Sequence, residues 1–145
     1  MEIFTIGFTQ KSAEAFFGTL KQSGVRQLVD VRLNNKSQLA GFAKRGDLAY
    51  FLRELCDAAY SHEPLLAPTQ DMLGAYRRKI MTWSDYERKY LELLDSRQVG
   101  TQIARQTFET RSVLLCSELK PDRCHRRLAA EYLAGVWGDV NIVHL

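Results

Sequence analysis

The fold is decided by residues 3–31, which read IFTIGFTQKSAEAFFGTLKQSGVRQLVDV. Residues 3–6 form an apolar, β-rich run that is typical of a short strand. Ser12 offers a side-chain cap for a helix that Gly24 can end, and residues 25–31 have the apolar character of a buried strand. A strand, a helix and a second strand in this order predict a right-handed crossover between parallel strands.

The rest of the chain continues the same alternation. We expect further strands over residues 59–62, 112–116 and 140–143, and helices that begin at Asp47, after a capping box at Ser84, over 99–108 and over about 123–136. This pattern predicts a single domain over residues 1–145, a three-layer α/β/α sandwich of the Rossmann-like or flavodoxin-like class with a mainly parallel sheet of about five strands. The connection over residues 64–82 is long, and long connections are more often functional or mobile than inert.

The composition is that of an ordinary folded protein. The 145 residues are 46% hydrophobic and 26% charged, which excludes disordered, collagenous and coiled-coil proteins, and the net charge of +3 leans only mildly toward anionic partners. No apolar run approaches the roughly 18–20 residues that span a bilayer. We therefore expect a cytoplasmic protein without membrane contact, whose cysteines, odd in number, are reduced. The sequence does not predict an oligomeric state.

Candidate site residues follow from the position of the strand ends. In open α/β sheets, ligands bind outside the carboxyl ends of the strands. This rule selects Gly7, Asp30, Arg32, His62 and the loop of residues 116–126. The loop leads into a predicted helix whose free amides favour an anion, and Arg126 in the first turn would add a bidentate donor while burying little surface. The alternatives are solvated arginines behind a helix capped by Asp122, or an internal ion pair of Arg126 with Asp30 or Glu118.

The same loop carries candidate catalytic groups. Cys116 and Cys124 are possible nucleophiles, with Glu118 or His125 as proton acceptor. The alternative is that both thiols are buried as small hydrophobes, and that His125, which shares the apolar face of its helix, bonds to a strand-end carbonyl or to Glu118. Six residues separate Cys116 from Arg123 and none is glycine, which disfavours a phosphatase loop. Adjacent Cys124 and His125 would point about 100° apart on a helix, so we expect no metal, and no cofactor is predicted.

Six short motifs occur in a recognisable order: Thr5-Ile6-Gly7, Asp30-Val31-Arg32, Tyr60-Ser61-His62, Cys116-Ser117-Glu118, Cys124-His125-Arg126 and Val143-His144. In this order the chain resembles the domain of unknown function 488 family over essentially its whole length. The resemblance implies a three-layer α/β domain with the motif residues gathered at one end of the sheet, and it implies no reaction. Many members have histidine or tyrosine where this chain has Phe8, and residues 33–46 resemble the family's polar loop.

Three functions compete at this point. The favoured one is binding of a phosphate-bearing small molecule or nucleic acid at the strand-end crevice. Two clusters that combine basic and aromatic residues resemble nucleic-acid surfaces: Lys36, Lys44 and Arg45 around Phe42, and residues 77–79 beside Tyr76 and Trp83. In the alternative, Tyr76 and Trp83 only anchor the long connection to the core. The competing functions are an enzyme with a cysteine nucleophile and a non-catalytic interaction module.

Overall fold

One parallel sheet organises the chain. The computed structural model describes residues 1–36 and 41–145, and its five strands lie in the order β3-β2-β4-β1-β5, with every pairing parallel. The strands are β1 (Glu2–Gly7), β2 (Gln27–Asp30), β3 (Ala59–His62), β4 (Ser112–Cys116) and β5 (Asn141–His144). The predicted five-stranded parallel sheet is confirmed. Its register sets Gly7 beside Cys116 and Asp30 beside Leu115, so these strand ends share one edge.

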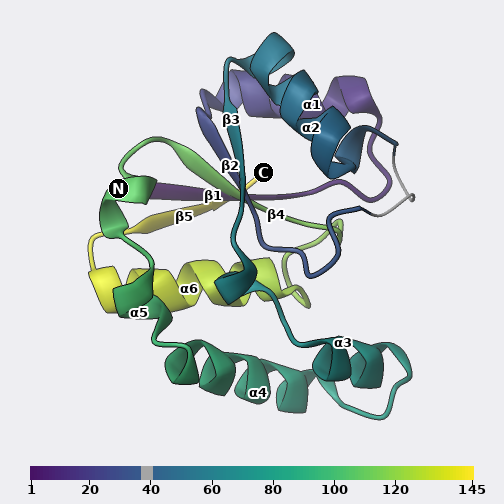
Figure 1. The fold of residues 1–145 in the computed structure, drawn as a ribbon, viewed down its shortest axis with the longest axis vertical. Helices are drawn as coiled ribbons and strands as arrows, with labels where there is room; N and C mark the ends of the chain where they lie inside the picture. The colour runs from purple at the N-terminus through teal and green to yellow at the C-terminus, as the bar shows by residue number, and fades with distance from the viewer. Residues whose placement is uncertain (37–40) are drawn as a thin grey trace.

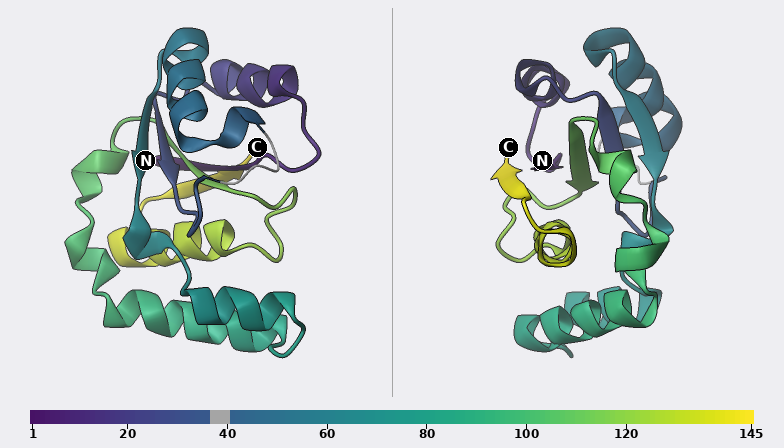
Figure 2. Two further views of the ribbon diagram at one scale, coloured as in Figure 1. Left: turned by 45° about the vertical axis from the view of Figure 1, so that its right-hand side comes forward. Right: turned by 90° about the vertical axis from the view of Figure 1, so that its left-hand side faces the viewer.

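Helices cover both faces of the sheet, as Figures 1 and 2 show. One face carries α1 (Ala13–Ser23) and α2 (Arg45–Phe51), which continues into a π-helical turn over Leu52–Cys56. The opposite side carries α3 (Gln70–Arg77), α4 (Trp83–Ser96), α5 (Val99–Gln102) and α6 (His125–Trp137). Short 3-10 turns lie at Gly41–Ala43, Pro64–Leu66 and Arg105–Phe108. The predicted three-layer α/β architecture is therefore confirmed.

Local capping explains where several helices begin. Ser12 accepts a hydrogen bond from the Ala15 amide, as predicted, and Gly24 ends α1 with a φ of 71°, a left-handed conformation that glycine adopts without strain. The capping box predicted at Ser84 is wrong, because Thr82 caps α4 by accepting from the Asp85 amide. Likewise α2 begins before Asp47, and the helix predicted over 99–108 divides into α5 and a separate 3-10 turn.

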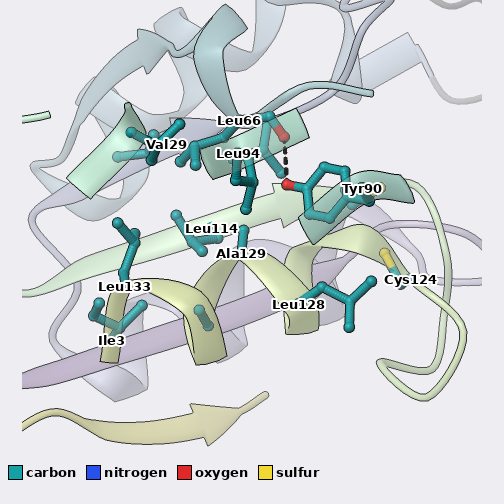
Figure 3. Packing of buried hydrophobic residues seen from close by; sticks show 14 of the residues in the cluster. Ile3, Val29, Leu66, Tyr90, Leu94, Leu114, Cys124, Leu128, Ala129 and Leu133 are labelled. Atoms are coloured by element: carbon teal, nitrogen blue, oxygen red, sulfur yellow. Dashed lines mark hydrogen bonds between the residues drawn. The ribbon is translucent and has the colours of Figure 1, made fainter. Parts of the chain in front are cut away.

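Each face of the sheet has its own hydrophobic core. Toward α1 and α2, the core includes Phe4, Ile6 and Phe16. Toward α4 and α6, side chains from the strands and the helices pack together, including Ile3, Leu114 and Leu133 (Figure 3). Tyr90 of α4 lies within this second core and donates a hydrogen bond of 2.7 Å to the Leu66 carbonyl. This bond fixes α4 against the connection that follows β3.

A search of the described helices for a membrane-spanning segment found none that combines the required length and apolar character.

Candidate functional site

A cleft of about 1160 Å³ opens beside the carboxyl ends of β2 and β4. Its inner wall consists of residues 32–34, 116–118 and 123–125, and its outer wall comes from α3, the start of α4 and the turn between them. In Figure 1 the loop between β4 and α6 and the turn between α3 and α4 lie on the same side of the molecule. The predicted strand-end crevice and the predicted basic, aromatic cluster near residue 77 are thus two walls of one cleft.

Cys124 is the residue that shapes the floor of this cleft. It precedes α6 with φ −137° and ψ 136°, an extended conformation, so it is the N-cap residue and lies outside the helix proper. The helix therefore begins at His125, two residues later than predicted. The expectation that Cys124 and His125 diverge as helical neighbours is wrong, because only one of them has helical geometry. Ligand atoms of Cys116, Cys124 and His125 all lie within 4.8 Å of one another.

The imidazole of His125 contacts both a carbonyl and a thiol. Its Nε2 lies 2.8 Å from the carbonyl oxygen of Val31, just beyond the end of β2. A carbonyl only accepts hydrogen bonds, so Nε2 carries the proton and Nδ1 has the free lone pair when the ring is neutral. Cys116 Sγ lies 3.5 Å from Nδ1 and 3.7 Å from Nε2. The predicted hydrogen bond to a strand-end carbonyl is therefore present, together with a Cys–His contact.

The two thiols at the floor are electrostatically different. The Cys124 thiol, the Ser117 and Glu118 amides and the Arg126 guanidinium favour the thiolate of Cys116, and they lower its pKa despite burial. Burial and the neighbouring Cys116 raise the pKa of Cys124 well above its ordinary value. Burial also raises the pKa of Cys56, which lies far from the cleft in the core beneath α1. Cys116 is thus the thiol that ionises first.

Arg126 is a fully buried residue. Its side chain is 0% exposed, so the expectation that it buries little is wrong. Nη1 donates to the Glu118 carbonyl and lies 3.4 Å from Cys124 Sγ, while Nη2 donates to the Leu119 carbonyl at 3.3 Å. It pairs with neither Asp30 nor the Glu118 carboxylate in the described chain. The guanidinium thus stabilises the loop between β4 and α6 from its buried side and does not line the cleft.

Gly7 lies against this loop. A Cβ added to Gly7 would come 1.6 Å from the Glu118 carbonyl oxygen and 3.0 Å from Arg126 Nη1. The backbone of β1 can approach the loop so closely only because glycine has no side chain there. Gly7 therefore positions the loop and is not placed to contact a ligand in the cleft.

Arg32 and Asp30 form a buried ion pair. Arg32 Nε and Nη2 donate to the two carboxylate oxygens at 2.9 and 2.8 Å, and the pair is 3% and 0% exposed. Tyr60 donates a further bond of 2.7 Å to Asp30, and burial together with this bond raises the pKa of Tyr60 to about 12. The guanidinium lies over the Phe8 ring at 5.2 Å. Its Nη1 is buried and has no partner among the described residues.

Aromatic rings and cations form the outer wall. Trp83 and Tyr86 stack with ring centroids 5.2 Å apart, and Tyr76 packs against both. They anchor the long connection to the core, as the alternative interpretation predicted, and they also line the cleft. Arg77 and Lys79 lie at its rim and are exposed. The charged side chains along the cleft are thus four cations, namely Arg32, Arg77, Lys79 and Arg123, and the single carboxylate of Glu118.

Comparison with known proteins identifies the family. The model described as "Domain of unknown function DUF488" matches residues 12–133, which is most of the chain. The chain belongs to the DUF488 family. Searches of the curated proteins and of the solved structures gave no match.

The DUF488 motifs occupy different parts of the site. Those that contain Arg32, Cys116 and Cys124 contribute directly to the cleft. Tyr60 and His62 lie behind it, where His62 Nε2 contacts the Arg32 carbonyl oxygen at 2.8 Å. Thr5-Ile6-Gly7 and Val143-His144 fall outside the matched range. At the position where many DUF488 members have histidine or tyrosine, Phe8 is buried beneath Arg32 and offers no proton to transfer.

Lys36 lies apart from the cleft. It is exposed and is not a lining residue, and residues 37–40 of the predicted polar loop lie outside the described residues. Phe42 packs on Phe16 and Phe17 at 5.3 and 5.7 Å, so the ring is part of the core beneath α1. A second pocket, of about 650 Å³, lies on this other face between α1 and α2 and contains none of the predicted site residues.

Proposed function

We propose that the cleft binds a phosphate-bearing ligand, either a nucleotide or a segment of nucleic acid. The observation that carries the proposal is the charge of its walls. Arg77, Lys79 and Arg123 are exposed and form no salt bridge with another residue of ranges 1–36 and 41–145. Three uncompensated cations around one concave surface attract a polyanion more strongly than the net charge of +3 suggests.

Arg32 supports binding at the inner end of the cleft. Two of its nitrogens are held by Asp30 and the Ala43 carbonyl, which fixes the guanidinium plane. The remaining Nη1 is a buried donor with no partner in ranges 1–36 and 41–145, and such donors are costly unless a ligand or water accepts from them. A phosphate oxygen is a strong acceptor for a guanidinium held in this way.

The aromatic wall supports a ligand that carries bases. Nucleobases stack on aromatic side chains with about 1–3 kcal/mol per base, largely independent of sequence. Trp83 is half-buried and Tyr76 is half-buried, so each ring is fixed by the core and still lines the cleft. Phosphates at the cationic rim and bases against these rings would use both kinds of side chain at once.

The rim cations provide a matched test of this proposal. Arg77→Ala is expected to weaken binding of a short single-stranded oligonucleotide roughly three- to tenfold at low salt, and to reduce the slope of log K against log salt by about 0.7–1, because one phosphate contact is lost. Arg78→Ala is the control, because Arg78 is the exposed neighbour that does not line the cleft. Fluorescence anisotropy over a salt series measures both quantities.

If the ligand is a nucleotide and not a nucleic acid, a different result is expected. Nucleoside triphosphates would then raise the melting temperature, since a ligand at one hundred times its Kd adds about 2.7 kcal/mol of stability. Equal losses of affinity in Arg77→Ala and Arg78→Ala would place binding on the general surface. No binding of oligonucleotides, nucleotides or inorganic phosphate at low salt would contradict the proposal.

A second candidate function is covalent catalysis by Cys116, favoured by its contact with His125. The sulfur lies 3.5 Å from Nδ1, and the Val31 carbonyl holds the ring from its other nitrogen. Nucleophile, base and an orienting group are the three parts that thiol catalysis requires. Glu118 lines the cleft beside them and is a further proton acceptor.

The ionisation of Cys116 can be measured against an internal control. Because its pKa is lowered, we expect alkylation of Cys116 by iodoacetamide to reach its plateau at a lower pH than that of a free thiol, whose pKa is about 8.5. Cys56 should require a higher pH, since burial raises its pKa. The two are 5% and 8% exposed, so access alone does not separate them. Peptide mass spectrometry measures the alkylation rate of each thiol as a function of pH. If the midpoints for Cys116 and Cys56 both lie at about pH 8.5 or above, catalysis by Cys116 is excluded.

A further inference from the structure

Three metal-binding side chains converge at the floor of the cleft. Cys116 ends β4, Cys124 caps α6 and His125 begins it, and one ligand atom from each lies within 4.8 Å of the other two. All three are buried, and all three line the cleft. Two sulfurs and an imidazole nitrogen are the donors that borderline and soft metal ions prefer.

The spacing agrees with tetrahedral coordination. Zn–S bonds of about 2.3 Å and Zn–N bonds of about 2.0–2.1 Å, at the tetrahedral angle, set sulfur and nitrogen roughly 3.5 Å apart. The distance between Cys116 Sγ and His125 Nδ1 is 3.5 Å. Nδ1 is also the nitrogen with a free lone pair, because Nε2 donates to the Val31 carbonyl. A backbone carbonyl that holds the second ring nitrogen is a common outer partner of a metal-binding histidine.

A buried guanidinium lies next to the proposed ligands. Arg126 is buried, and no carboxylate of the described ranges forms a salt bridge with it. A buried cation is costly unless a negative charge lies nearby. Metal-bound thiolates would supply that charge, since Cys124 Sγ lies 3.4 Å from Nη1.

We propose that Cys116, Cys124 and His125 bind a divalent transition metal ion of the zinc class, with the fourth coordination position directed to the cleft. Three protein ligands and one open position are the arrangement of a catalytic metal site, whereas structural sites are closed by four protein ligands. The site does not depend on binding of a phosphate-bearing ligand. As a metal ligand, Cys116 has no free thiolate, so this role and nucleophilic catalysis exclude each other.

Cobalt is the direct probe of such a site. The full chain, freed of metal by a chelator under reducing conditions, is titrated with Co²⁺ and then with Zn²⁺. We expect thiolate-to-cobalt charge-transfer absorption and tetrahedral d–d bands that saturate at one ion per chain, and Zn²⁺ should abolish both. Cys116→Ser and Cys124→Ser should each weaken cobalt binding by more than about 100-fold, since loss of an outer partner alone costs 10–100-fold.

Cys56→Ser is the matched control, because Cys56 is also a buried free cysteine but lies under α1 with its thiol directed to the Phe17 carbonyl. This variant should bind cobalt like the unaltered protein. If a serine variant unfolds, protection of the thiols from alkylation in the unaltered chain replaces that variant as the test. Zn²⁺ should slow alkylation of Cys116 and Cys124 and leave that of Cys56 unaffected. No charge-transfer band, or unchanged alkylation of Cys116 with saturating Zn²⁺, would overturn the proposal.

Discussion

Arg126→Ala is expected to destabilise the protein by about 3–5 kcal/mol, because it removes a large buried side chain and leaves two carbonyls without their donor. The guanidinium is 0% exposed and donates to the Glu118 and Leu119 carbonyls. It also lies beside Cys124 Sγ. Without it, the loop between β4 and α6 loses the group that holds it against the strand ends.

Arg126→Lys separates charge from geometry at this position. Lysine restores the positive charge but offers a point charge where arginine bonds two carbonyls at once, so an intermediate loss of stability is expected. Urea unfolding of both variants measures the difference. If both unfold like the unaltered protein while oligonucleotide binding is lost, Arg126 contacts the ligand and its structural role is wrong.

Asp30→Asn should cost about 3–5 kcal/mol, the usual effect of removing one partner from a buried ion pair. The substitution keeps the shape of the side chain and removes its charge, which leaves the Arg32 guanidinium buried and uncompensated. Arg32 is only 3% exposed, so water cannot replace the carboxylate. We also expect weaker oligonucleotide binding, because Asp30 fixes the plane of the guanidinium that lines the cleft.

Tyr60→Phe is the matched control for Asp30. It removes the 2.7 Å hydrogen bond to the same carboxylate and the 3.1 Å bond that the hydroxyl accepts from Asn35 Nδ2, with an expected cost of about 2 kcal/mol. The two variants are compared by urea unfolding at neutral pH, where Tyr60, with a pKa of about 12, is protonated and donates its hydrogen bond. If both variants lose the same small amount of unfolding free energy, the Asp30–Arg32 pair behaves as a solvated ion pair.

The fold could be predicted from the sequence because its signals are local. Residues 3–31 show a strand, a capped helix and a buried strand, and the later segments repeat that alternation. Helix starts were less predictable. Thr82 and Ser84 are both residue types that cap helices, and the structure uses Thr82, so that Trp83, which packs against the core, is the first residue of α4.

The site could be predicted only in part. The strand-end rule identified Arg32, Cys116, Glu118, Cys124 and His125, which all line the cleft. It did not assign the outer wall to the same site, because the local pattern does not say which side of the sheet a long connection covers. Tyr76 and Arg77 were recognised as a basic, aromatic cluster, and only the packing of α3 on α4 brings them opposite the strand ends.

The burial of Arg126 and the convergence of Cys124 with His125 were not predicted, and they have a common physical cause. A first-turn residue is normally solvated, yet Arg126 is buried because the preceding loop folds over it and supplies carbonyl acceptors. Cys124 and His125 converge because α6 begins at His125 and leaves Cys124 outside the helix. Sequence patterns do not resolve a helix boundary to one or two residues. Both features arise from the path of the loop over residues 117–124.

We propose that the cleft between the strand ends and the α3–α4 wall is the ligand site. Amide NMR spectra of isotope-labelled protein, titrated with a short single-stranded oligonucleotide at low salt, test it most directly. We predict that the shifted resonances belong to residues 32–34, 76–79 and 116–118, with little change in α1 and α2. Shifts concentrated at the pocket between α1 and α2, or no shifts at all, would mean that the cleft is not the ligand site.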